Sequence, residues 1–169
     1  MRRLRLIAAL RRLRLARRAV ASVEFAVCGV AFILMLMLVL NLGDLALVLS
    51  AMTYSTQVTV RQAAVQSGAN LANAAQGTVA SCVSQTQILG YFNSAMPSLL
   101  PQATNGGTGA GAPAIQAVWS QPGSNGIYLQ VTASYNWVPF GAHAITLPLK
   151  VSETQMIDGT SGSVTMQCS

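Results

Sequence analysis

The sequence predicts an α+β fold in which a long N-terminal helix, first membrane-spanning and then juxtamembrane, packs on a small antiparallel sheet. Three observations support this fold class. An uncharged apolar run covers residues 25–43, apolar residues recur at helical spacing until about residue 73, and apolar and polar residues alternate in two segments near the C-terminus.

The low content of charged residues indicates a membrane location. Charged residues make up 8% of the 169-residue chain, about a third of the share that is usual in soluble proteins. The mean hydropathy is +0.48. A chain of this length suits one modest domain together with one membrane segment.

The run from Phe25 to Gly43 has the length of a transmembrane helix. Its nineteen residues, at about 1.5 Å each, extend over roughly 28 Å, which is close to the hydrocarbon thickness of a bilayer. A membrane helix is therefore predicted over residues 20–44, with Asp44 at the far interface. The remaining residues, 45–169, would form an exported domain.

Basic residues are concentrated before this run. Eight of the ten lie before Ala19, where there is no acid, and the formal charge of +6 becomes −2 when these eight are set aside. Positive charge on this side predicts that the N-terminus stays in the cytoplasm. A basic tail can also bind nucleic acid, but no aromatics are interleaved with these arginines, so we expect no nucleic-acid partner.

Two kinds of targeting segment compete with an uncleaved span. A cleaved secretory signal has a shorter apolar region, and "NLGDLALVLSAM" offers no clear small-x-small cleavage site. A mitochondrial transit peptide is also rich in arginine and poor in acid. The apolar span that follows this leader argues against a transit peptide.

One carboxylate, Glu24, lies at the start of the apolar run. A charged side chain at the bilayer centre costs about 2.5–3.5 kcal/mol on insertion scales, and less near the edge. Glu24 therefore either marks the interface or pairs with a cation inside an assembly. Cleavage after Ala19 would leave a free amine on Val20, one helical turn before Glu24.

The stretch "RRAVASVEF" resembles the processing site of the TadE-like minor pseudopilins of tight adherence (Tad) pili, in the type IVb pilus systems. The resemblance implies that residues 1–19 form a cleaved leader and that the scissile bond joins Ala19 to Val20. The family usually has Gly before the cut, where this chain has Ala. The likeness continues in residues 43–69 and in the "VTASYNWVPF…ITLPLKVSETQ" stretch. The implied processing residues are Arg17, Arg18, Ala19, Val20 and Glu24.

The resemblance implies that the protein is a minor pilin-like subunit that helps to assemble a Tad-type surface pilus or secretion machine. The subunit would lie in the bacterial inner membrane, with its C-terminal domain exported. The implied partners are a prepilin peptidase, other pilin or pseudopilin subunits and an inner-membrane assembly platform, with Glu24 and Phe25 in the assembly interface. Two other classes stay open. One is an unprocessed bitopic envelope protein whose exported domain binds a ligand or a cell-wall component, and the other is a secreted hydrolase with an unusual signal.

The first part of the exported domain has a helical pattern. A second helix is expected over residues 78–96, and Pro97 would end it. Residues 97–113 are rich in Gly and Pro and predict a flexible connector, in which "TNGGTGAG" is a plain loop rather than a display tip. The first helix presents an apolar stripe with a gap at Thr56: Leu45, Val48, Leu49, Met52, Val60, Ala63 and Ala64.

Beyond residue 113 the period changes from 3.6 to 2. Residues 127–137 and 145–152 alternate between apolar and polar, which predicts two strands, each with one buried face. The stretch "VPFGAH" is expected to turn between them, and Pro148 favours an edge strand because proline cannot donate to a ladder. The short runs "IQAVW" and "SVTMQC" are candidates for further strands.

The three cysteines differ in their predicted surroundings. Cys28 falls inside the span, where it is a small apolar residue. Cys82 and Cys168 would both lie outside the cytoplasmic membrane, where disulfides persist, and Cys168 continues the alternating face of Val164 and Met166. We predict a Cys82–Cys168 bridge, and the sequence leaves interchain pairing open as an alternative.

The sequence contains no pattern typical of a catalytic site. The single histidine, His143, is a loop residue beside the predicted turn, and the four acids are too dispersed for a carboxylate pair. No CxxC, HExxH, P-loop or G-x-S-x-G spacing occurs. We predict no enzymatic activity, metal or cofactor. Four aromatic residues are expected to pack in the core or between strands rather than form a binding surface: Trp119, Tyr128, Tyr135 and Trp137.

Overall fold

The structure is a computed structural model of the whole chain. It describes the backbone of residues 2–75, 78–98, 100–106, 111–120, 126–140, 145–158, 160–161 and 164–168, and within these ranges the side chains of all residues except 2–21 and 158–166. The chain divides into two compact units, Met1–Gly43 and Asp44–Ser169. We call the second unit the head.

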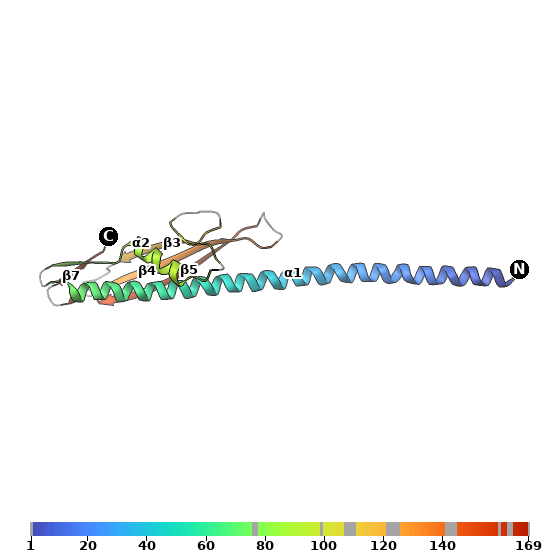
Figure 1. Cartoon of the computed structure of the whole chain (residues 1–169), viewed down its shortest axis with the longest axis horizontal. Coiled ribbons are helices and arrows are strands. Elements are labelled where there is room, and N and C mark those ends of the chain that lie inside the picture. The colour runs from blue at the N-terminus through green and yellow to red at the C-terminus, as the bar shows by residue number, and fades with distance from the viewer. Residues whose placement is uncertain are drawn as a thin grey trace. The chain divides into compact units, whose positions relative to one another are not determined.

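The fold is α+β, as the sequence predicts. The helix α1 is the longest element and contributes to both units, and the other elements all belong to the head (Figure 1). The elements are α1 (Arg2–Asn73), β1 (Val79–Ser81), α2 (Gln85–Ala95), β2 (Thr104–Asn105), β3 (Ala114–Ser120), β4 (Gly126–Trp137), β5 (Leu147–Asp158), β6 (Thr160–Ser161) and β7 (Val164–Gln167).

Four strands form the main sheet of the head, in the order β2-β3-β4-β5. The pairs β3–β4 and β4–β5 are antiparallel, but β2 pairs with β3 in parallel. The prediction of a purely antiparallel sheet is therefore wrong. Gly106, just after β2, and Gly111, before β3, have φ values of 59° and 93°, which glycine adopts readily.

In the long hairpin of β4 and β5, β4 confirms the predicted alternation, but the predicted buried face of the second strand is wrong for Ile145 and Leu147, which are exposed. Register runs from Gly126 opposite Asp158 to Trp137 opposite Leu147, and alternate residues of β4 are buried. The strand β5 begins later and extends further than the predicted 145–152. It lies at the edge of the sheet, as Pro148 indicates, and most of its side chains stay exposed, so its second half carries a weak apolar signal.

A second, three-stranded sheet has the order β1-β7-β6, with β1 and β7 in parallel. The predicted runs "IQAVW" and "SVTMQC" correspond to β3 and β7. The expected helix over residues 78–96 is too long, because its first residues form β1. The helix α2 begins only after Ser84, whose hydroxyl accepts the Gln87 N–H at 3.4 Å while the Gln87 side chain accepts the Ser84 N–H at 3.1 Å. This capping box stops the helix from extending back into β1.

The core of the head lies between the sheet, α2 and the part of α1 that follows Asp44. Fully or nearly buried residues from all three meet there, among them Met52, Phe92 and Leu129. The predicted gap at Thr56 is not a gap, because this residue is fully buried. Three buried hydroxyls on α1 donate to the carbonyl oxygen four residues earlier, at 2.6–2.8 Å: Ser55, Thr56 and Thr59.

Part of the predicted flexible connector is packed. Ala103 and Pro113 are buried, and the Asn93 side chain holds both backbone groups of Ala103: its Oδ1 accepts the N–H at 2.7 Å and its Nδ2 donates to the carbonyl at 3.3 Å. The centre of "TNGGTGAG", residues 107–110, lies outside the described residues. So do residues 141–144 of the predicted turn, including His143.

Candidate membrane and assembly segment

The helix α1 begins with a long apolar surface. Within Ser22–Asn73 the most apolar 18-residue window has a mean hydropathy of 2.7 and none of it is buried. Large apolar side chains between Val23 and Leu42 expose from 47% to 79% of their area. By length and composition this helix can cross a membrane, where such a surface contacts lipid and every backbone group stays bonded within the helix.

The only strongly polar side chain of residues 25–43 bonds within its own helix. Asn41 Nδ2 donates to the Met37 carbonyl at 2.8 Å. This contact satisfies an amide N–H of a side chain that is costly to place in hydrocarbon without hydrogen bonds. Cys28, the free cysteine, is exposed on the same apolar helix.

The predicted processing and assembly residues lie on one continuous helical backbone. Arg17 to Val20 are helical, and their side chains lie outside the described residues. Glu24 and Phe25 follow one turn later with exposed side chains. Among the described side chains none bonds to the Glu24 carboxylate, so within this part of the chain the acid has no internal partner.

A hydrogen bond that the sequence did not reveal lies at the start of the head. Trp137 Nε1 donates to Asp44 Oδ2 at 2.7 Å, and the indole is only 5% exposed. The bond joins the first residue of the head to the last residue of β4. The alternation of β4 indicates that Trp137 is buried, but no local signal connects it to an acid 93 residues earlier in the chain.

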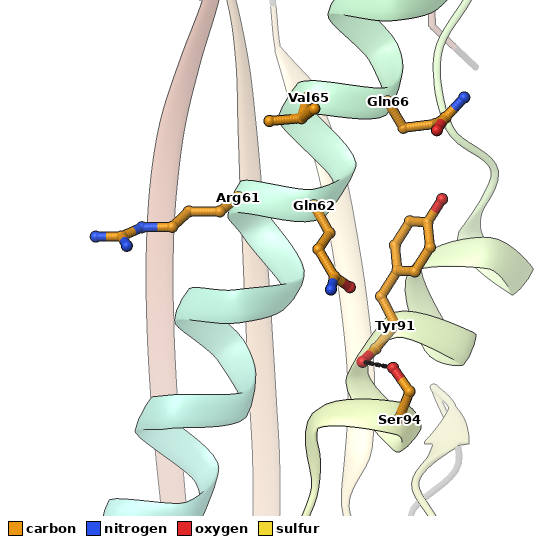
Figure 2. A pocket seen from close by; sticks show the side chains of 6 residues that line it. All are labelled: Arg61, Gln62, Val65, Gln66, Tyr91 and Ser94. Carbon is orange, nitrogen blue, oxygen red and sulfur yellow. Dashed lines mark hydrogen bonds between the residues drawn. The ribbon is translucent and has the colours of Figure 1, made fainter.

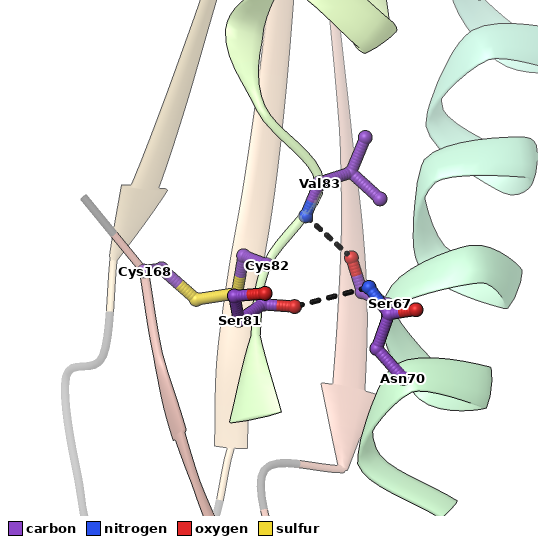
Figure 3. The surroundings of a disulfide bond; sticks show 6 residues. All are labelled: Ser67, Asn70, Ser81, Cys82, Val83 and Cys168. Atoms are coloured by element: carbon purple, nitrogen blue, oxygen red, sulfur yellow. Dashed lines mark hydrogen bonds between the residues drawn. A yellow bond between two sulfur atoms is a disulfide. The ribbon is translucent and has the colours of Figure 1, made fainter. Parts of the chain in front are cut away.

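The predicted disulfide is present. Cys82 and Cys168 are joined, with their Cα atoms 5.0 Å apart (Figure 3). Around it, Ser67 Oγ accepts the Val83 N–H at 3.2 Å and Asn70 Nδ2 donates to the Ser81 carbonyl at 3.1 Å. These contacts tie α1, β1 and the C-terminal strand together.

Two hollows of similar volume lie beside α1 in the described part of the head. One, of about 500 Å³, is lined chiefly by apolar side chains, among them Leu100, and also by Asp44 and Tyr54. The other, of about 460 Å³, is more open, and in Figure 2 Gln62 and Gln66 lie on the side of Tyr91 while Arg61 extends away from it. In the described part of the chain no three His, Cys, Asp or Glu residues are placed to hold a metal ion.

The four aromatic residues singled out in the sequence lie in β3 and β4. Trp137 is buried, and Trp119 and Tyr135 are partly buried against the core of the head. Tyr128 is partly exposed. The two tryptophans and Tyr135 therefore contribute to packing.

No protein-family model, curated protein or solved structure matches the chain.

Proposed function

We propose that this protein is a membrane-anchored, pilin-like minor subunit, similar to the TadE-like pseudopilins, that takes part in assembling a Tad-type surface pilus or secretion machine. One observation carries the proposal. An exposed carboxylate, Glu24, lies at the start of an exposed apolar helix, directly after an arginine-rich segment. The α+β head that follows this helix is the part that would contact partners outside the membrane.

In this proposal the arginine-rich leader acts as a cytoplasmic anchor. Its eight positive charges hold the N-terminus inside while residues 45–169 are exported. A prepilin peptidase then cuts between Ala19 and Val20. The cut removes the charges that fix the helix in the membrane, so that the helix can move from lipid into an assembly.

The same cut would create the partner of Glu24. The new amine on Val20 lies one turn, or about 6 Å along the axis, from residue 24. The attraction between amine and carboxylate grows in a medium of low dielectric constant. A single buried charge is costly without a partner, so a helix bundle would favour subunits in which both groups are present.

The N-terminal residue and intact mass of the protein from its native membrane test the processing step. We expect a chain that begins at Val20 and retains the apolar run. A chain that keeps its arginines in cells with an active peptidase would contradict the proposal. Loss of the whole run would instead indicate a secreted protein.

Substitution of Glu24 tests the assembly step. Glu24→Ala and the isosteric Glu24→Gln should both insert into the membrane but enter the fibre poorly, because both lack the charge. Ser22→Ala is the matched control, since Ser22 is an exposed neighbour on the same helix. The measurement is the amount of subunit recovered with sheared fibres relative to membranes, and normal recovery of Glu24→Gln would rule out a role for the charge.

A second candidate is an unprocessed bitopic envelope protein whose head binds a ligand. The observation in its favour is the hollow of about 500 Å³ near Asp44, which has the size and largely apolar lining of a small-molecule site. The N-terminal measurement above separates this candidate from the first, because it requires an intact leader.

A further inference from the structure

Exposed apolar side chains gather at the end of the β4–β5 hairpin. Val138, Phe140, Ile145 and Leu147 expose 42%, 66%, 56% and 42% of their area, and we call these four residues the hairpin tip. The sequence from residue 138 to residue 149 contains no Asp, Glu, Lys or Arg. An exposed apolar patch of this kind usually marks an interaction surface.

The structure places the hairpin tip at the start of the head. Trp137 pairs with Leu147 at the base of the tip, and its Nε1 donates to Asp44 Oδ2 at 2.7 Å. Asp44 directly follows Gly43, the last residue of the apolar run. If the run spans a bilayer, the membrane surface lies near Asp44, and the base of the tip is held within hydrogen-bond distance of that residue.

The chemistry of this region suits the interface of a bilayer. Large apolar side chains such as phenylalanine and leucine bury at the boundary between the headgroups and the acyl chains when a segment lies on a membrane surface. Phe140 is the most exposed member of the tip, whereas the Trp137 ring is buried in the core of the head, where its bond to Asp44 fixes the base of the tip. The absence of full charges over residues 138–149 means that insertion would not require a charged side chain to lose its water.

We propose that the hairpin tip inserts into the interfacial lipid of the membrane that anchors α1, as a second membrane contact besides the helix. The inference rests on the membrane anchoring in the proposed function but not on processing or fibre assembly. The contact would hold the head against the membrane before assembly, and it would have to be released when the subunit leaves the bilayer.

Depth-dependent fluorescence quenching tests the proposal. The full-length chain is reconstituted into phosphatidylcholine vesicles that carry bromine on the acyl chains near the glycerol backbone, and into unbrominated vesicles. Phe140→Trp reports on the tip. Val65→Trp is the matched control: this apolar side chain is 74% exposed and lies 21 residues beyond Asp44 on α1, or roughly 30 Å along the axis.

We expect brominated lipid to lower the extra tryptophan fluorescence of Phe140→Trp by about twofold. The extra fluorescence of Val65→Trp should hardly change, because only the ring at residue 140 lies in lipid. Equal quenching of the two variants in vesicles that carry the protein on flotation would overturn the tip contact and leave the anchor intact. Failure to float would overturn the anchor and the tip contact together. The emission at residue 140 could instead shift to the blue as protein density rises, without quenching by brominated lipid. This result would show that the tip contacts a second protein chain, and it would refute the lipid contact.

Discussion

Ser67 and Ser55 provide a matched test of how the head is held together. Both serines are on α1 and both are fully buried. The hydroxyl of Ser67 accepts the backbone N–H of Val83 at 3.2 Å, and Val83 is only 2% exposed. The hydroxyl of Ser55 donates to the Ala51 carbonyl at 2.8 Å, an oxygen that already accepts a helical N–H. Replacement by alanine is the same chemical change at both sites, but only Ser67→Ala leaves a buried group without a partner.

The expected costs follow from this difference. A buried donor without an acceptor costs about 1–3 kcal/mol, and alanine returns up to about 0.5 kcal/mol of helix propensity. We therefore expect Ser67→Ala to lower the free energy of unfolding by about 1–2 kcal/mol. For Ser55→Ala we expect a change within about 0.5 kcal/mol, because no buried group loses its only partner.

Urea unfolding of the full-length chain in detergent micelles, followed by tryptophan fluorescence, measures both changes. Trp119 and Trp137 lie in the main sheet, so the signal reports on the head. Amide exchange at Val83 adds a local measurement, and Ser67→Ala should speed it up while Ser55→Ala should not. Equal unfolding midpoints for the two variants, with unchanged exchange at Val83, would refute the assignment of this hydrogen bond.

Three further predictions concern other contacts of the head. Asp44→Ala should cost about 1.5–3 kcal/mol because the Trp137 N–H loses a charged acceptor; urea unfolding should show this loss, and Asp44→Asn, which keeps an acceptor oxygen, should lose less. Reduction of the Cys82–Cys168 bond should lower the free energy of unfolding by about 4 kcal/mol, because the bond closes a separation of 86 residues. An unchanged unfolding midpoint under reducing conditions would contradict its structural role. Phe92→Ala should cost about 3–5 kcal/mol, since the ring is fully buried, and thermal unfolding should show a larger shift for it than for Asp44→Ala.

Local periodicity and composition account for what could be predicted. The apolar run, the extent of α1 to Asn73 and the alternation of β4 are properties of neighbouring residues, so they can be read along the chain. The pairing of Cys82 with Cys168 was predictable because few cysteines were available. The edge position of β5 followed from Pro148, which lacks an N–H.

Other features depend on residues that are distant in the chain. The parallel pairing of β2 with β3 makes the sheet mixed, and the pairing of β1 with β7 replaces the first turns of the expected second helix. Thr56 looked like a break in the apolar stripe. In the structure its hydroxyl bonds to a carbonyl of its own helix, which lets a polar residue be buried.

The sequence by itself determined that this chain has one apolar helix with a carboxylate at its start, a basic segment before it and an α+β domain after it, because hydropathy and period are local properties. Only the tertiary structure decided that Asp44 bonds to Trp137, and that the apolar end of the β4–β5 hairpin therefore lies where the head begins. Such contacts arise when strand register and helix packing bring together residues far apart in sequence, and no local pattern specifies them in advance.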